Sequence, residues 1–104
     1  MITLQGILSK LREMKPLLEN KYKIINLEIF GSYVKGTENL DSDIDILVEF
    51  KENADLFDLI KLSQFLEEKL NKKIDLVSKQ SLRKELKQKV FKEVVAVWEI
   101  INFM

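Results

Sequence analysis

Residues 43–50, with the sequence Asp-Ile-Asp-Ile-Leu-Val-Glu-Phe, constrain this chain more than any other stretch. The alternation of aspartate with isoleucine predicts a strand, in which residues two apart lie on the same face. Asp43 and Asp45 would then project the same way at the start of that strand. Because two adjacent carboxylates repel, one would stay protonated unless a cation neutralised the pair. Mg²⁺, which binds carboxylates together with substrate phosphates, suits such a pair.

A turn of small residues precedes this strand. Gly31 and Ser32 follow an apolar run at 27–30, and ten residues separate Ser32 from Asp43. Backbone N–H groups in such a turn bind phosphate, especially where a helix begins. The turn and the carboxylates together indicate a site that handles a nucleotide.

The combination of Gly31-Ser32, ten residues and Asp43-x-Asp45 resembles the signature of the DNA polymerase beta-like nucleotidyltransferase superfamily, and within it the minimal nucleotidyltransferase (MNT) domains. The resemblance covers nearly the whole chain. It implies an α+β fold of the two-layer kind, a small mixed β-sheet packed by helices. It also implies Mg²⁺-dependent nucleotidyl transfer with ATP as the substrate. By the same resemblance, the catalytic and metal-binding residues are Asp43, Asp45 and Asp75, and the nucleotide-binding residues are Gly31, Ser32, Lys35, Gly36 and Ser42.

Asp75 is the third acidic candidate. It lies in an otherwise apolar segment, 73–77, where an unpaired carboxylate would be costly to bury. The family places a third carboxylate on a neighbouring strand. The resemblance therefore makes Asp75 the base-like group nearest the attacking hydroxyl, or a ligand of a second ion. The alternative is an exposed aspartate on an edge strand.

Three further residues carry smaller parts of the resemblance. Many family members have arginine just before the second glycine, whereas this chain has Lys35 before Gly36. A lysine keeps the point charge but loses the planar bidentate fork, which concerns triphosphate binding and not the metal site. Ser42 precedes Asp43 as in the family, and we expect it to make a turn hydrogen bond that positions the carboxylate.

The resemblance also implies a partner. Minimal members of the family are commonly encoded beside a HEPN-domain ribonuclease toxin, and they act as antitoxins by transferring AMP to a tyrosine of that toxin. One alternative is an antitoxin that neutralises the toxin by binding alone, although pure binding needs none of the acidic and glycine residues named above. Another is a transferase that acts on a small antibiotic or on a nucleic-acid end.

Composition narrows the remaining possibilities. A chain of 104 residues with 46% hydrophobic content suits a single domain, 1–104, and its formal net charge of zero gives no sign of direct nucleic-acid binding. Without cysteine or histidine, chemistry has to rely on carboxylates, lysines, hydroxyls and a hard metal ion. No apolar run approaches the roughly 20 residues of a membrane span, and no signal peptide is visible. We therefore expect a cytoplasmic protein without membrane contact, and self-association into a homodimer stays open.

Hydrophobic periodicity predicts the order of elements. Helical spacing covers 4–18 after a capping Thr3, with an interruption near Pro16. Strands are predicted at Ile24–Phe30, 43–50 and 73–77. A helical turn is predicted at Ser32–Lys35 and a loop at 37–42. A longer helix is predicted to begin near Asn53 or Asp55 and to end at Asn71. A last helix is predicted to begin at Ser78 or Ser81, with basic residues over 79–92. These residues form either an electrostatic binding surface for an acidic partner or a nucleotide, or simply a solvent-exposed face. The β-branched run at 94–98 fits a helix or a strand, and Trp98 is expected in the core or a dimer contact.

Overall fold

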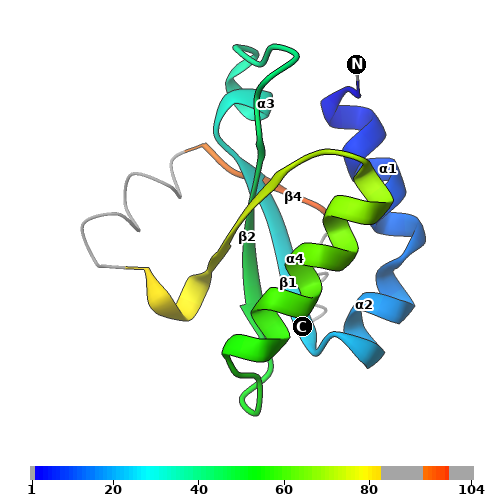
Figure 1. Cartoon of the computed structure of the whole chain (residues 1–104), viewed down its shortest axis with the longest axis vertical. Coiled ribbons are helices and arrows are strands. Elements are labelled where there is room, and N and C mark those ends of the chain that lie inside the picture. Colours follow the sequence, from blue (N-terminus) through cyan, green and yellow to red (C-terminus); the bar gives the residue numbers. More distant parts are fainter. Residues whose placement is uncertain (1, 83–92, 99–104) are drawn as a thin grey trace, which may run out of the picture.

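A computed structural model describes residues 2–82 and 93–98 of the protein. Its helices are α1 (Leu4–Glu13), α2 (Lys15–Lys21), α3 (Ser32–Lys35), α4 (Leu56–Leu70) and the 3₁₀ turn η1 (Lys79–Ser81). Its strands are β1 (Ile24–Phe30), β2 (Ile44–Phe50), β3 (Ile74–Ser78) and β4 (Val95–Ala96) (Figure 1). Within the described residues the strands form one sheet in the order β3-β2-β1-β4. β1 runs antiparallel to β2 and β4, whereas β2 and β3 are parallel. This mixed sheet with helices confirms the predicted α+β class.

Pro16 divides the N-terminal helical segment in two. α1 begins after Thr3, whose side-chain oxygen accepts a hydrogen bond from the Gly6 N–H at 3.0 Å. It ends at Glu13, and Pro16 then lies in the first turn of α2. Proline lacks an N–H group and fits only the first turn of a helix, where that donor has no intrahelical partner. The interruption predicted near this residue is confirmed.

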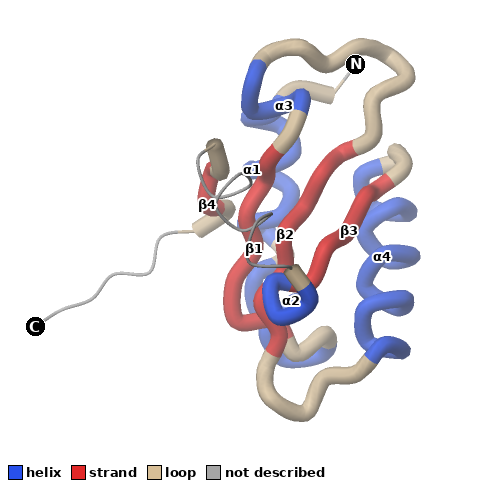
Figure 2. Tube along the Cα trace, turned by 90° about the vertical axis from the view of Figure 1, so that its left-hand side faces the viewer, coloured by secondary structure: helices blue, strands red, loops and turns tan. Residues whose placement is uncertain are grey.

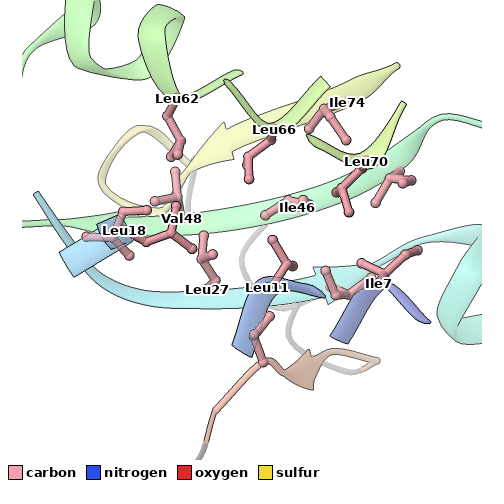
Figure 3. Packing of buried hydrophobic residues seen from close by; sticks show 14 of the residues in the cluster. Ile7, Leu11, Leu18, Leu27, Ile46, Val48, Leu62, Leu66, Leu70 and Ile74 are labelled. Carbon is pink, nitrogen blue, oxygen red and sulfur yellow. The ribbon is translucent and has the colours of Figure 1, made fainter. Parts of the chain in front are cut away.

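The hydrophobic core lies between one face of the sheet and helices α1, α2 and α4. Figure 3 shows side chains of α1 and α4 pointing toward the middle of β1 and β2. The buried residues of this layer include Ile7, Leu11, Leu18, Leu27, Ile44, Ile46, Val48, Leu62, Leu66 and Leu70. Figure 1 and Figure 2 both show α1 and α4 covering the same face of the sheet.

The opposite face of β2 carries the predicted site. Since Ile44, Ile46 and Val48 pack on the helices, Asp45 and Leu47 project from the other face. Leu47 is nevertheless 1% exposed, so β2 is apolar on both faces, as expected of a central strand. Asp45 therefore lies on a strand whose buried apolar residues hold it in place on both faces of the sheet.

Local signals define both ends of α4. At its start, the Asp55 carboxylate accepts a hydrogen bond from the Asp58 N–H at 3.1 Å, and the Asp58 carboxylate accepts one from the Asp55 N–H at 2.8 Å. This reciprocal pair is a capping box. At its end, Asn71 adopts the left-handed conformation with φ 51°, as predicted. The chain then turns into β3, and the Ile44 N–H donates to the Lys73 carbonyl at 3.0 Å.

Of the elements predicted after β3, the structure confirms some and not others. The run at 94–98 contains a strand, since Val95 lies opposite Ile29 and Ala96 opposite Glu28. Trp98 is buried in the core. Ser78 closes β3 and leads into η1, after which Leu82 is extended, so no α-helix begins at Ser78 or Ser81. The rest of that predicted helix, with most of its basic face, lies at 83–92, outside the described residues. Among the helices that the structure describes, none is long and apolar enough to cross a bilayer.

Candidate functional site

The register of the parallel strands brings two predicted site residues together. Asp45 of β2 lies directly opposite Asp75 of β3, and their side chains share a hydrogen bond. Neighbouring strands are about 4.8 Å apart, which places two same-face carboxyls within reach of one another. Asp75 is exposed, and β3 lies at one edge of the sheet formed by the described residues. Asp75 is therefore an exposed edge-strand aspartate and at the same time the partner of Asp45.

Asp43 lies one residue before β2. The prediction that the strand begins at 43 is wrong by one residue, because β2 begins at Ile44. The Asp43 charge still acts on Asp45, since it contributes to the raised pKa of that carboxyl. All three predicted acidic residues thus belong to one electrostatic cluster.

The surroundings of Asp45 raise the pKa of its carboxyl. Burial is the largest cause and, together with the charge of Asp75, the hydrogen bond with Asp75 and the charge of Asp43, raises the pKa of Asp45 from 3.8 to about 6. The backbone N–H of Ser32 donates a hydrogen bond to the Asp45 carboxylate and acts in the opposite direction. Like charges and desolvation both disfavour a second negative charge at this point. Without a cation, a proton on Asp45 relieves the repulsion between the carboxylates and so stabilises the cluster.

Gly31 makes room for this carboxylate. Its φ of 75° is a backbone conformation that favours glycine, and a Cβ atom added there would lie 2.0 Å from Oδ2 of Asp45. The sequence predicts that Gly31 lets phosphates approach the backbone. The structure adds a second reason for glycine, namely the close approach of Asp45. Gly31 also begins α3, because its carbonyl accepts hydrogen bonds from the N–H groups of Val34 and Lys35 at 3.1 Å each.

The loop between α3 and β2 is tied down by its own polar groups. Ser42 Oγ accepts a hydrogen bond from the Asn39 N–H at 2.9 Å, and the Ser42 N–H donates to the Asn39 carbonyl at 3.1 Å. Asn39 Oδ1 in turn accepts from the Asp41 N–H at 2.8 Å. The turn hydrogen bond expected of Ser42 is therefore present, and it fixes the approach to Asp43.

Two residues that steady this loop were not among the predicted site residues. Asn39 forms a turn with its own side chain, which its residue type and its loop position could have suggested. Lys72 donates from Nζ to the Leu40 carbonyl at 2.9 Å. Because 32 residues separate Lys72 from Leu40, no local pattern points to this contact.

Lys35 and Gly36 end the short helix beside the site. Lys35 is exposed in the last turn of α3. Gly36 has φ 77° and its N–H donates to the Ser32 carbonyl, so it closes α3 in a left-handed conformation. A Cβ atom at Gly36 would meet nothing within 4 Å. At position 36 only the backbone angle favours glycine. At position 31 the close approach of Asp45 excludes a side chain as well.

The chemistry of these donors fits a hard divalent cation. All three side chains offer carboxylate oxygen, the ligand that Mg²⁺ prefers, and their mutual repulsion is the kind that a cation removes. Within residues 2–82 and 93–98 no three acidic side chains converge to the distances of a formed metal site. The cluster therefore supplies suitable ligands that still have to draw together around an ion.

Known proteins resemble this chain in sequence and in structure. The profile of the nucleotidyltransferase domain matches residues 11–97. Protein adenylyltransferase MntA of Thermococcus cleftensis is 41% identical over 97 residues, which cover 93% of this chain and 98% of that protein.

Two solved structures extend the comparison to the fold. A toxin–antitoxin structure with AMP-PNP has a TM-score of 0.72 at 32% identity and covers 88% of this chain and 73% of that one. The tri-AMPylated Shewanella oneidensis HEPN toxin in complex with its MNT antitoxin gives a TM-score of 0.65 at 29% identity, with 89% of this chain and 71% of that one covered. The matched profile spans most of the chain and contains every predicted site residue. The chain thus belongs to the nucleotidyltransferase domain family and is a nucleotidyltransferase.

Proposed function

We propose that this chain is the antitoxin of a HEPN/MNT toxin–antitoxin pair and transfers AMP from ATP to a tyrosine of the HEPN toxin, with Mg²⁺ as the cofactor. The observation that carries the proposal is the meeting of Asp45 and Asp75, from two strands, beside the Ser32 N–H and within reach of the Asp43 charge. The relatives support the choice of acceptor. One is named a protein adenylyltransferase, and another is an antitoxin bound to an AMPylated HEPN toxin.

Each residue of the cluster has a role in the proposal. Asp43 and Asp45 hold the cation, and Asp75 either receives the proton of the acceptor or holds a second ion. The Gly31-Ser32 turn binds the phosphates, with Lys35 as a nearby positive charge and Gly36 and Ser42 shaping the two ends of the segment. When Mg²⁺ is bound, it stabilises negative charge on the attacking and leaving oxygens of an in-line displacement.

The proposed reaction is a single substitution at the α-phosphorus. The phenolic oxygen of the tyrosine forms a bond to that phosphorus while the bond to the bridging oxygen breaks, and pyrophosphate leaves with the electron pair. The phenolic proton, with an ordinary pKa of about 10, passes to a carboxylate, for which Asp75 is the candidate. Its exposure supports this role, because an acceptor on another protein has to reach it. The protein contributes mainly position and charge, which suits a chain without histidine or cysteine.

The proposal treats residues 1–104 as one domain that acts in the cytoplasm on a separate protein. It does not call for direct binding of nucleic acid. The neutral balance of 17 basic and 17 acidic residues supports this part of the proposal.

A direct test is to incubate the chain with ATP, Mg²⁺ and the HEPN-domain protein of the same genome, and to measure the mass of that protein. We expect the added mass of one or more adenylyl groups on tyrosine, located by peptide mapping. Asp45→Asn should abolish the addition. Glu68→Gln is the control, because it removes an exposed acidic charge from α4, on the other face of the sheet from Asp45, and should leave the addition intact. A stable complex without added mass would instead identify an antitoxin that acts by binding alone.

A further inference from the structure

The first half of α4 is apolar on its outer side as well as on its core side. Leu56, Phe57 and Ile60 are 67%, 70% and 44% exposed, whereas the core contacts of the helix come from Leu62, Leu66 and Leu70. Further along α4 the exposed positions are polar, as at Lys61, Gln64 and Glu68. A helix that is apolar on both sides is normally covered on both sides. We call Leu56, Phe57 and Ile60 the α4 patch.

A groove adjoins the patch at Leu56. It encloses about 630 Å³, a volume typical of binding pockets, and it is lined by Leu56 together with other apolar side chains of β1, β2, α4 and the loop before α4. Those apolar side chains are Ile25, Phe50, Ala54 and Leu59. The start of α4 lies at the opposite end of the molecule from α3 (Figure 1). The groove is therefore separate from the site at Asp45.

Among the residues that the structure describes, acids outnumber lysines around the groove. Glu49, Glu52 and Asp55 line it together with Lys51, and Lys79 forms an ion pair with Glu49 at 3.8 Å, which leaves Glu52 and Asp55 as the acids that face an occupant. The Lys51 ammonium donates to the Glu19 carbonyl at 2.8 Å and is thereby directed toward α2. An occupant that matches this surface has apolar side chains flanked by lysine or arginine. A second copy of the chain would bring Glu52 and Asp55 against the same two acids of its partner, so charge favours a different protein.

We infer that the α4 patch and its groove are a docking surface for the acceptor protein, which places there a segment with apolar side chains flanked by basic ones. The identity of the partner rests on the proposed function, and the position and chemistry of the surface do not. β2 has seven residues and so spans about 23 Å at 3.3 Å per residue. A partner helix of 20 residues is about 30 Å long, enough for one protein to occupy the groove and reach the carboxylates.

Docking at a distance from the reacting atoms has a kinetic signature. The contacts add the same binding energy in the ground state and in the transition state. Loss of such contacts raises KM and leaves kcat unchanged. The same loss leaves KM for ATP unchanged, because the nucleotide binds at the other end of β2.

The test compares three aspartate substitutions. Leu56→Asp and Ile60→Asp change the patch, and Leu17→Asp on α2 is the matched control, since Leu17 is 41% exposed and Ile60 44%. Leu56 lies in the first turn of α4, where an added negative charge does not oppose helix formation. Circular dichroism melts check that each variant folds. Binding to the HEPN-domain protein of the same genome is measured by calorimetry, and transfer by the rate of adenylyl incorporation.

We expect both patch variants to raise Kd and KM for the HEPN protein by about tenfold or more, the effect of losing a central contact, with kcat and KM for ATP unchanged. Leu17→Asp should behave like the wild type. Glu52→Lys should weaken binding as well, because it reverses a charge beside the groove. Folded patch variants that bind normally, or an equal loss in Leu17→Asp, would overturn the inference.

Two further outcomes separate the possibilities. If light scattering finds the isolated chain to be a dimer that Ile60→Asp converts to a monomer, the surface belongs to a second copy and the inference fails. If the wild type binds the HEPN protein through the patch but adds no AMP, the proposed function fails while the docking surface stands.

Discussion

At Gly31, one absent side chain determines where the Asp45 carboxylate sits. A methyl group there would have to share space with Oδ2 of Asp45, 2.0 Å away, in a backbone conformation with φ 75°. We expect Gly31→Ala to lower the free energy of unfolding by about 1–3 kcal/mol, the usual cost of such local strain. Because displacing a catalytic group by about 1 Å costs on the order of 100-fold in rate, transfer should fall by about that factor.

Gly36→Ala is the matched control for this prediction. Gly36 has φ 77°, yet a Cβ atom there would meet no neighbour. The substitution should cost roughly 1–2 kcal/mol of stability through the left-handed backbone alone, and it should lower the activity much less than Gly31→Ala does, because it leaves Asp45 in place. Denaturant unfolding and the adenylyl-incorporation assay measure the two effects. Equal loss of activity in both variants would mean that the contact with Asp45 is unimportant.

Asp45 should titrate close to neutral pH in the metal-free protein. Its pKa of about 6 results first from burial and then from Asp75, with a smaller part from Asp43. In Asp75→Asn the pKa should fall toward 3.8 but stay above it, because burial remains. Asp43→Asn should lower the pKa less. Carbon-13 NMR of the carboxyl carbons measures these values.

The same shift gives the sign of a stability effect. A carboxyl with a raised pKa contributes most to stability below its unfolded pKa, and this contribution is lost as pH rises through about 6. Metal-free protein should therefore lose stability between about pH 4 and 6 on account of Asp45. A pKa for Asp45 that is the same in the wild type and in Asp75→Asn would contradict the interaction between the two carboxyls.

Among the elements, those with local signals were predictable from the sequence. Thr3 marks the start of α1, Asp55 and Asn71 mark α4, and the order of the three site aspartates followed from the motif. β4 could not be assigned, because its β-branched residues fit a helix or a strand, and only pairing with β1 decides between them. The contact of Asp45 with Gly31 was equally hidden, since it depends on how β1 and β2 align.

The start of α4 offers a test of one such local signal. The Asp58 carboxylate accepts hydrogen bonds from the Asp55 N–H at 2.8 Å and from Lys23 Nζ at 3.3 Å. The first of these is the main cause that lowers the pKa of Asp58, and Lys23 adds to it. A lowered pKa means that this contribution is complete above the ordinary pKa and is lost as pH falls through the lowered value.

Asp58→Ala should therefore reduce the denaturant midpoint at pH 7, and the difference from the wild type should narrow at strongly acidic pH. Glu68→Ala, an exposed acid later in the same helix, should change the midpoint little at either pH. A deficit in Asp58→Ala that does not depend on pH would show that the ionised capping contact is not its source.

For the whole molecule, α4 is the element that assembles the site. Parallel neighbours in a sheet need a long crossover connection, and here α4 provides it between β2 and β3. Its core side packs on Ile46 and Val48, which fixes the register that sets Asp45 opposite Asp75. The complete acidic cluster therefore exists only in the folded chain, since the unfolded chain keeps Asp75 apart from Asp43 and Asp45.

This dependence predicts that Mg²⁺ stabilises the folded protein as a whole. A ligand that binds only the native state adds about 2.7 kcal/mol at 100 times its dissociation constant. We expect Tm to rise with Mg²⁺ concentration at pH 7.5 and much less at pH 5, where the proton on Asp45 competes with the ion. Asp45→Asn should abolish the rise, whereas Glu49→Gln, on the same face of β2, should retain it. Differential scanning calorimetry at both pH values measures the shift. An equal shift in Asp45→Asn and in the wild type would place the ion elsewhere on the protein.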